Sequence, residues 1–305
     1  KADFLLENFR PGTMEKWGCG YEDLAKINPR LIMIRVSGFG QTGPMAPRAG
    51  HDINYIALAG VLGAVGRKGA PPTMPLNLVG DFGGGGMLLA VGVLAALLEA
   101  SRSGKGQVVD AAMVDGAALL MAGIHGLYSQ GTWKDERGVN ILDTGAPWYE
   151  VYETSDGKWV SIGSIEGRFY EDLLARLGLA GEKLPKQWDK SGWPMLRERF
   201  AAAFKTKSRD AWCQVFEGSD ACFAPVLTMA EVEAHPHNRE RKTFLRVDGV
   251  MQAAPAPRFS RTAAKAGAAS RGVGTDTDAV LGAAGFAPER IKDLIARGVV
   301  GTAKS

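Results

Sequence analysis

The stretch LIMIRVSGFG at residues 31–40 constrains the fold more than any other part of this chain. An apolar run without polar alternation is typical of a strand that is buried on both faces of a parallel sheet. A strand-like segment, ADFLLENF, precedes it at 2–9, and a short helix is predicted between them at 21–27, ending at Asn28-Pro29. Strand, helix and strand in this order predict an α/β fold with a parallel sheet.

The pattern changes after the first third of the chain. An apolar helix is expected at 87–103, followed by a strand and a helix within VVDAAMVDGAALLMAGI, and then by a polar, turn-rich stretch at 130–150. Beyond it, YEVYETSDGKWVSIGS predicts a hairpin that turns at Ser155-Asp156-Gly157. Further helices are expected at 167–177, 194–204 and 208–217, then an extended return segment at 254–272 and a last helix in PERIKDLIARG. We therefore predict a large α/β domain (1–115), a linker (116–149), a small α+β domain (150–242), and a return linker with a C-terminal helix that packs on the large domain (243–305).

Charge, apolar runs and cysteines exclude several classes of protein. The net charge of +3 comes without any long run of like charges, which disfavours nucleic-acid binding. The longest apolar run, MLLAVGVLAALL at 87–98, is shorter than the roughly 20 residues that cross a bilayer, so a buried helix and no membrane contact are expected. The three cysteines lack CxxC spacing and indicate reduced thiols in the cytoplasm. The chain starts with KADFLLENF, without Met or a signal peptide, and is expected to lack an N-terminal piece together with any targeting information in it.

Two polar loops are the candidate functional segments, GHDINY at 50–55 and NLVGDFGGGG at 77–86. His51 is either a catalytic base or a structural histidine. Asp81 is either a second acid–base group or the cap of a flexible turn. The glycine-rich stretch is expected to open into a helix from Met87, whose first N–H groups would stabilise an anion or a transient oxyanion.

Several familiar sites are disfavoured. GFGQTG at 38–43 fits the dinucleotide pattern GxGxxG, but Pro44 and Pro47 prevent a helix from starting there. GDFGGGG lacks the Lys-Ser/Thr of a phosphate-binding P-loop. Without an HxxxH, HExxH or CxxC pattern a metal site is not expected, and without GxSxG neither is a serine hydrolase.

Seven strings in order along the chain resemble the family III CoA-transferase superfamily: ENFRPG, NPRLIMIRVSGFGQTGP, GHDINY, NLVGDFGGGG, GKGQVVDAAMVDG, SIGSIEGRFY and APRFSRT. The resemblance implies a Rossmann-like large domain, here without its N-terminal part, a smaller α+β domain, and an intertwined homodimer that acts on an acyl-CoA. GHDINY is similar to the branch that interconverts (2R)- and (2S)-2-methylacyl-CoA thioesters, an isomerase that needs no cofactor besides the CoA of its substrate. By this resemblance His51 and Asp81 are the catalytic bases, and Glu166 orients the histidine from the partner subunit. The implied CoA-contacting positions are Asn8, Phe9, Arg10, Lys16, Gly50, Asp52, Ile53, Asn54 and Tyr55.

The chemistry of such a reaction independently needs these residue types. Inverting the carbon beside a thioester requires one base on each face, with similar working pKa values. Histidine is near that range, and walls formed by Leu78, Val79 and Phe82 are expected to raise the pKa of Asp81 by desolvation. Donors for the enolate oxygen are expected from the turn at 83–86, and Asp52 is assigned a supporting or capping role. Two alternatives stay open: a CoA transferase in which Asp81 is the nucleophile, and an inactive truncated homologue.

Overall fold

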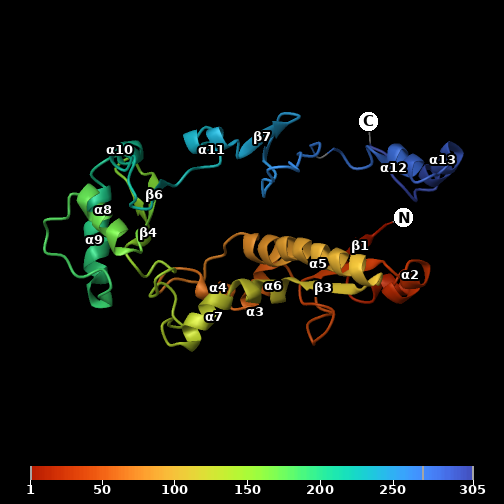
Figure 1. The fold of residues 1–305 in the computed structure, drawn as a ribbon, viewed down its shortest axis with the longest axis horizontal. Helices are drawn as coiled ribbons and strands as arrows, with labels where there is room; N and C mark the ends of the chain where they lie inside the picture. The colour runs from red at the N-terminus through yellow and green to blue at the C-terminus, as the bar shows by residue number, and fades with distance from the viewer. Residues whose placement is uncertain (1, 270, 304–305) are drawn as a thin grey trace. The chain divides into compact units, whose positions relative to one another are not determined.

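The structure is a computed structural model that describes residues 2–269 and 271–303. The chain forms two compact units, Lys1–Val226 and Leu227–Ser305, and the first of them contains two separate sheets (Figure 1). The domain boundaries predicted at 115/116, 149/150 and 242/243 stay predictions.

A three-stranded parallel sheet organises the first part of the chain. Its order is β1-β2-β3, with Phe4 opposite Ile32 and Met33 opposite Val108. The central strand is the one that the apolar run predicted, and its residues Ile32, Met33 and Ile34 are fully buried. The predicted parallel α/β architecture is therefore confirmed. The strands are β1 (Phe4–Glu7), β2 (Ile32–Ser37) and β3 (Val108–Ala112), and the helices between the first two are α1 (Thr13–Lys16) and α2 (Tyr21–Ile27).

Helix α5 (Leu88–Ser103) covers one face of this sheet through Ala96 and Ala100, which pack against β2. It was predicted to be buried, and that is wrong for part of the helix, because Val91, Leu94 and Leu98 are 60%, 68% and 54% exposed. The apolar helical stretch is also longer than predicted. It joins the preceding helix without a break over Leu78–Ser103, 26 residues, which by length and composition alone would be enough to cross a membrane. Packing of α5 on the sheet is the ordinary arrangement of a crossover helix in an α/β fold.

The glycine-rich segment forms η1 (Leu78–Met87), a helix with hydrogen bonds to the fifth preceding residue, such as Phe82 N to Asn77 O at 3.4 Å. It was expected to be a turn, and the structure corrects this: the helix starts at Leu78 rather than at Met87. Ile56, Ala59, Val61 and Ala117 form the core between this helix and its neighbours. These neighbours are α3 (Asp52–Leu58), α4 (Val61–Ala64) and α6 (Met113–Leu120), and α7 (Ala122–Ser129) follows along the chain.

A second sheet, antiparallel and ordered β4-β5-β6, forms the predicted small α+β part. The predicted hairpin and the three predicted helices are confirmed. Aromatic side chains fill the core, and the indole N–H groups of Trp148 and Trp193 both donate to the Gln187 carbonyl, at 3.1 and 2.9 Å. The elements are β4 (Tyr149–Glu153), β5 (Trp159–Gly163), α8 (Gly167–Arg176), η2 (Lys190–Gly192), α9 (Trp193–Phe204), α10 (Arg209–Val215) and β6 (Phe223–Pro225).

Within its described residues, the second unit contains a hairpin and three helices. The described part of the predicted return segment, 254–269 and 271–272, has no helix or strand. Helix α13 is the predicted last helix, and it packs against α12. Packing of α13 on the large domain stays a prediction. The elements are α11 (Pro236–Arg241), β7 (Phe244–Val247), β8 (Val250–Ala253), α12 (Thr277–Ala283) and α13 (Pro288–Ala296).

Candidate active site

His51 stands at the residue immediately before α3. Its backbone is extended, with φ −134° and ψ 175°, and its N–H donates to Asn54 Oδ1 at 3.1 Å. This is half of the reciprocal bonding that fixes the entry of a chain into a helix. The imidazole is exposed, so it is available to a ligand. Asn54, predicted to contact CoA, thus has a structural role at the start of α3.

Asp81 lies in the first turn of η1 and is half-buried. Its Oδ2 accepts a hydrogen bond from Asn77 Nδ2 at 3.2 Å, and its backbone N–H donates to Asp52 Oδ2 at 2.8 Å. Asp52 is only 5% exposed. The structure therefore brings together two predicted site residues that are far apart in sequence, Asp52 and Asp81.

A hollow of about 230 Å³ lies where β1 and β2 end. The carboxyl ends of parallel strands are where open α/β sheets bind ligands. Six predicted site residues line it: Asn8, Phe9, Arg10, Gly50, His51 and Tyr55. The sequence analysis did not name the rest of the lining: Pro11, Ser37, Gly38, Phe39, Ala46, Arg48 and Ala49.

Arg10 and Arg48 give this hollow a positive charge that suits a phosphate-bearing ligand. Arg48 had a sequence signal, because it is a cation in the glycine- and proline-rich loop directly before GHDINY. Four predicted contact residues, Lys16, Asp52, Ile53 and Asn54, do not line the hollow.

Tyr55 fixes the loop that carries His51. Its hydroxyl donates to the Gly50 carbonyl, and its ring meets Phe39 edge-on at 4.9 Å. A Cβ at Gly38 or Gly50 would lie only 2.0 or 2.7 Å from the Tyr55 ring, so both ends of the loop at 38–51 need glycine. Burial, with the negative charges of Asp81 and Asp52 as smaller causes, raises the pKa of Tyr55.

A buried ion pair that the sequence analysis missed supports the ENFRPG loop. Glu7 is 5% exposed, accepts the Phe9 N–H at 2.7 Å, and lies 3.6 Å from Arg35 Nε. The signal was a glutamate at the end of an otherwise apolar strand, FLLE. It holds the backbone of Phe9, which lines the hollow.

Two expectations about the glycine-rich segment are wrong: the walls around Asp81 and the donors for the enolate oxygen. Leu78 and Phe82 are 57% and 58% exposed, so they do not wall in its carboxylate. The amides of residues 83–86 lie inside a continuous helix rather than at a helix start, so they are not free donors for an enolate oxygen.

Glu166 is not among the residues that line the hollow with His51. It is the exposed residue directly before α8. The expected contact with the histidine of another subunit stays a prediction.

No three His, Cys, Asp or Glu side chains come together as a metal-ligand set within residues 2–269 and 271–303. The loop at 38–51 contains no helix, as Pro44 and Pro47 predicted, so GFGQTG lacks the helix of a dinucleotide fingerprint.

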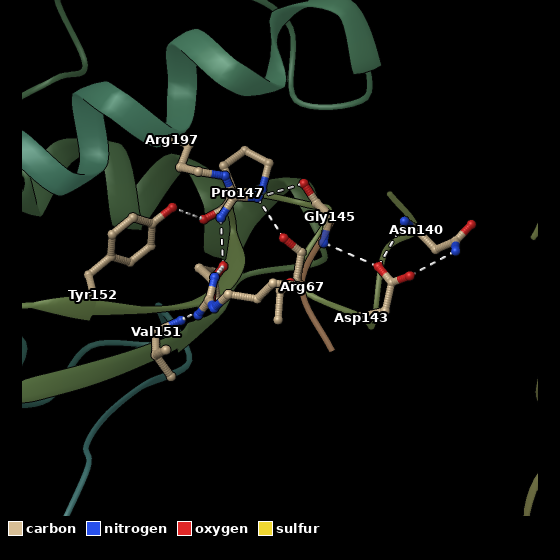
Figure 2. A network of polar contacts seen from close by, with 10 residues as sticks. Arg67, Asn140, Asp143, Gly145, Pro147, Val151, Tyr152 and Arg197 are labelled. Carbon is tan, nitrogen blue, oxygen red and sulfur yellow. Dashed lines mark hydrogen bonds and ion pairs between the residues drawn. The ribbon is translucent and has the colours of Figure 1, made fainter. Parts of the chain in front are cut away.

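A larger hollow of about 540 Å³ is lined by the first part of α9 and by loop residues, among them Arg67, Gly145 and Arg197. These three residues also belong to a polar network (Figure 2). The Glu150 carboxylate, 2% exposed, binds Arg67 at 2.7 and 3.0 Å and Arg197 at 2.6 Å. Arg197 also donates to the carbonyls of Thr144 and Gly145. The guanidinium groups of Arg67 and Arg197 already have partners within the protein. This network therefore has a structural role.

Comparison with known proteins identifies the family. The family model described as CoA-transferase family III matches residues 1–277. The chain is 48% identical over 297 residues to the α-methylacyl-CoA racemase of Mus musculus, and 45% identical over 296 residues to that of Homo sapiens. Each match covers 96% of this chain and 78% of the relative. A crystal structure of a CaiB/BaiF family protein from Brucella suis superposes with a TM-score of 0.74 at 26% identity, covering 92% of this chain and 75% of that one. The chain belongs to the family III CoA-transferases.

Proposed function

We propose that this chain is an isomerase that interconverts the (2R) and (2S) epimers of 2-methylacyl-CoA thioesters. Its two relatives at 45–48% identity are named α-methylacyl-CoA racemases. The single observation that carries the proposal in the structure is the bond between Asp52 and the backbone of Asp81, because Asp52 directly follows His51. It joins the segments that present one histidine and one carboxylate, the two base types that the reaction needs.

The reaction moves one proton off and one proton onto the same carbon. One base takes the α-proton, the C–H electron pair becomes the C=C bond of an enolate, and the negative charge moves to the thioester oxygen. The conjugate acid of the other base then protonates the opposite face, and the enolate collapses to the epimer. The reverse direction exchanges the two roles. No electrons leave the substrate, so we propose that the enzyme needs no cofactor other than the CoA that its substrate carries.

The nucleotide part of CoA has a place in this proposal. The hollow with Arg10 and Arg48 presents cations beside His51, and its walls include the Phe9 and Phe39 rings. Phosphates pair with guanidinium groups, and aromatic rings accept a flat base. We therefore assign the CoA moiety to this hollow.

Solvent exchange tests the reaction. The protein incubated with either epimer in deuterium oxide should incorporate deuterium at C2 and approach an equal mixture of epimers. His51→Ala and Asp81→Ala should each lower racemisation by about 10²–10⁴-fold. His237→Ala, a change to an exposed histidine of α11, is the control and should leave the rate unchanged.

The rival within the family is CoA transfer, with Asp81 attacking the thioester. In that case the protein would move CoA to a free acid without α-exchange, Asp81→Ala would be inactive, and His51→Ala would be nearly silent. If a folded protein that binds CoA shows neither α-exchange nor CoA transfer, the chain is not a catalyst.

A homodimer in the cytoplasm completes the proposal. Glu166 of one subunit would bind the imidazole of the other and fix its tautomer. The exposure of both side chains supports this, since each is open to a second copy. Mixing inactive His51→Ala with inactive Glu166→Ala subunits should restore about one active site per mixed dimer. No recovery after proven subunit exchange would contradict the shared site. The three free thiols support a reducing compartment, which cell fractionation would test.

A further inference from the structure

Asp52 is a buried carboxylate with an incomplete set of partners. It is 5% exposed, its Oδ2 accepts the Asp81 N–H at 2.8 Å, and its Oδ1 has no hydrogen-bond partner among the described residues. A charged group buried with an unused acceptor atom destabilises a fold by more than a neutral side chain would. Stability alone therefore gives little reason for an aspartate here.

Gly80 makes room for this carboxylate. A Cβ on Gly80 would lie 2.5 Å from Asp52 Oδ2 and 3.1 Å from Ile56 Cγ2. Since Gly80 directly precedes Asp81, any larger residue would push the carboxylate away from the Asp81 amide. Two positions, 52 and 80, thus serve the same hydrogen bond.

The bond reaches a free amide at the start of a helix. The first N–H groups of a helix have no partner within it, and an anion there also interacts favourably with the helix dipole. Asp81 is in this first turn of η1. The carboxylate of Asp52 consequently holds the backbone of the residue whose side chain is the proposed base.

The same short helix holds the other base. His51 directly precedes α3 and Asp52 is its first residue, while Tyr55, one turn later, holds the Gly50 carbonyl on the other side of His51. A displacement of about 1 Å between catalytic groups lowers a rate by about 10²-fold. A hydrogen bond that fixes the separation of His51 and Asp81 therefore has a direct effect on the rate.

We propose that Asp52 is a positioning residue that sets the separation of the two bases: it is rigidly joined to His51 through the chain and holds Asp81 through its backbone amide. This rests on the proposed function, in which His51 and Asp81 act on opposite faces. It changes the assignment of Asp52 from a CoA contact to an internal acceptor.

Three variants test the acceptor role. Asp52→Ala removes the acceptor, Asp52→Leu removes it while filling the volume, and Asp52→Asn keeps one carbonyl oxygen. In Asp52→Ala and Asp52→Leu, kcat for racemisation should fall by about 10²-fold, whereas the Kd of CoA by calorimetry should stay within about twofold. Asp52→Asn should recover most of the loss. A variant without Asp52 that racemises at the wild-type rate, or an Asn variant no better than Leu, overturns the proposal.

A readout that needs no activity separates this proposal from the proposed function. Hydrogen exchange by mass spectrometry over residues 77–83 should become faster in Asp52→Leu and stay near wild type in Asp52→Asn. If the wild type shows no α-exchange of substrate, the racemase proposal fails, and the amide measurement still decides whether Asp52 holds Asp81. If the amide protection over residues 77–83 is unchanged in a folded Asp52→Leu protein, the proposed role of Asp52 in holding Asp81 is contradicted in either case.

Discussion

Tyr152 in β4 and Tyr170 in α8 are two buried tyrosines whose hydroxyl groups differ in their hydrogen bonding. The Tyr152 hydroxyl donates to the Pro147 carbonyl at 2.6 Å, whereas the Tyr170 hydroxyl has no partner within the described residues. A buried polar group without a partner destabilises a fold by about 1–3 kcal/mol. Tyr170→Phe should therefore leave the free energy of unfolding unchanged or raise it by up to about 1 kcal/mol, and Tyr152→Phe should lower it. Urea unfolding followed by tryptophan fluorescence measures both; a clear loss in Tyr170→Phe would contradict the unpaired hydroxyl.

The same two residues make stability fall in alkali. Burial raises the pKa of Tyr170 to about 12, and burial also raises the pKa of Tyr152. In the unfolded chain tyrosine loses its proton near pH 10. The unfolded state therefore binds fewer protons above that pH, and the unfolding free energy declines as the pH rises from about 10 to about 12. Tyr170→Phe should make the slope of the unfolding free energy against pH less steep, by the equivalent of up to one bound proton. Unfolding at a series of pH values measures this slope. An unchanged slope would show that Tyr170 ionises normally in the fold.

The element that carries Asp81 shows why its glycines are needed. Gly84 packs directly on α6, where a Cβ would lie 2.6 Å from Ala117 N, and a Cβ on Gly116 would lie 2.0 Å from Gly84 O. Two helices in backbone contact leave no space for a side chain. Helix packing, rather than the approach of a ligand to a loop, is what these two glycines serve.

Gly84→Ala should lower the free energy of unfolding by about 1–3 kcal/mol through overpacking. Gly86→Ala, two residues later in the same helix, is the matched control, because its Cβ would make an ordinary contact of 3.7 Å with Asp81 O. That change should be neutral or stabilising by up to about 1 kcal/mol, since alanine favours helix over glycine. Equal losses in the two variants, by thermal unfolding, would contradict close packing of η1 on α6.

Over the first unit as a whole, Glu150 joins distant parts of the chain. Arg67 follows α4, Arg197 lies in α9, and Glu150 itself is in β4. Glu150 is 2% exposed, whereas the side chains of Arg67 and Arg197 are 54% and 33% exposed, so water can solvate both guanidinium groups once the carboxylate is removed. The loss is therefore smaller than for a fully buried pair and is set by the hydrogen bonds to the charged carboxylate, about 1.5–3 kcal/mol. Surface pairs contribute about 0–1 kcal/mol.

Glu150→Ala should therefore lower the free energy of unfolding by about 1.5–3 kcal/mol. Glu153→Ala is the control, since Glu153 pairs with Lys205 at 2.8 Å with both side chains over 40% exposed. Its change should stay within about 1 kcal/mol. Denaturant unfolding of both variants gives the comparison. Two equal, small effects on the free energy of unfolding would show that the Glu150 cluster does not stabilise the fold.

Much of this protein was readable from its sequence. The apolar run at 31–40 determined a central buried strand, and the turn at Ser155-Asp156-Gly157 determined a hairpin, because both depend on residues next to each other in the chain. The loops that present His51 and the ENFRPG segment were also visible as polar tips after strands. Such features follow from local periodicity and turn chemistry.

Only the tertiary structure decided how these pieces meet. The helix at 78–87 was mistaken for a turn, since four consecutive glycines disfavour a helix unless a neighbour such as α6 packs against them. The bond from Asp52 to Asp81 and the pairing of Glu150 with Arg67 join residues that sequence spacing does not relate. The exposure of α5 likewise depends on what covers it, which no periodicity encodes. Local pattern fixes the elements, whereas long-range contacts fix which side chains share a site.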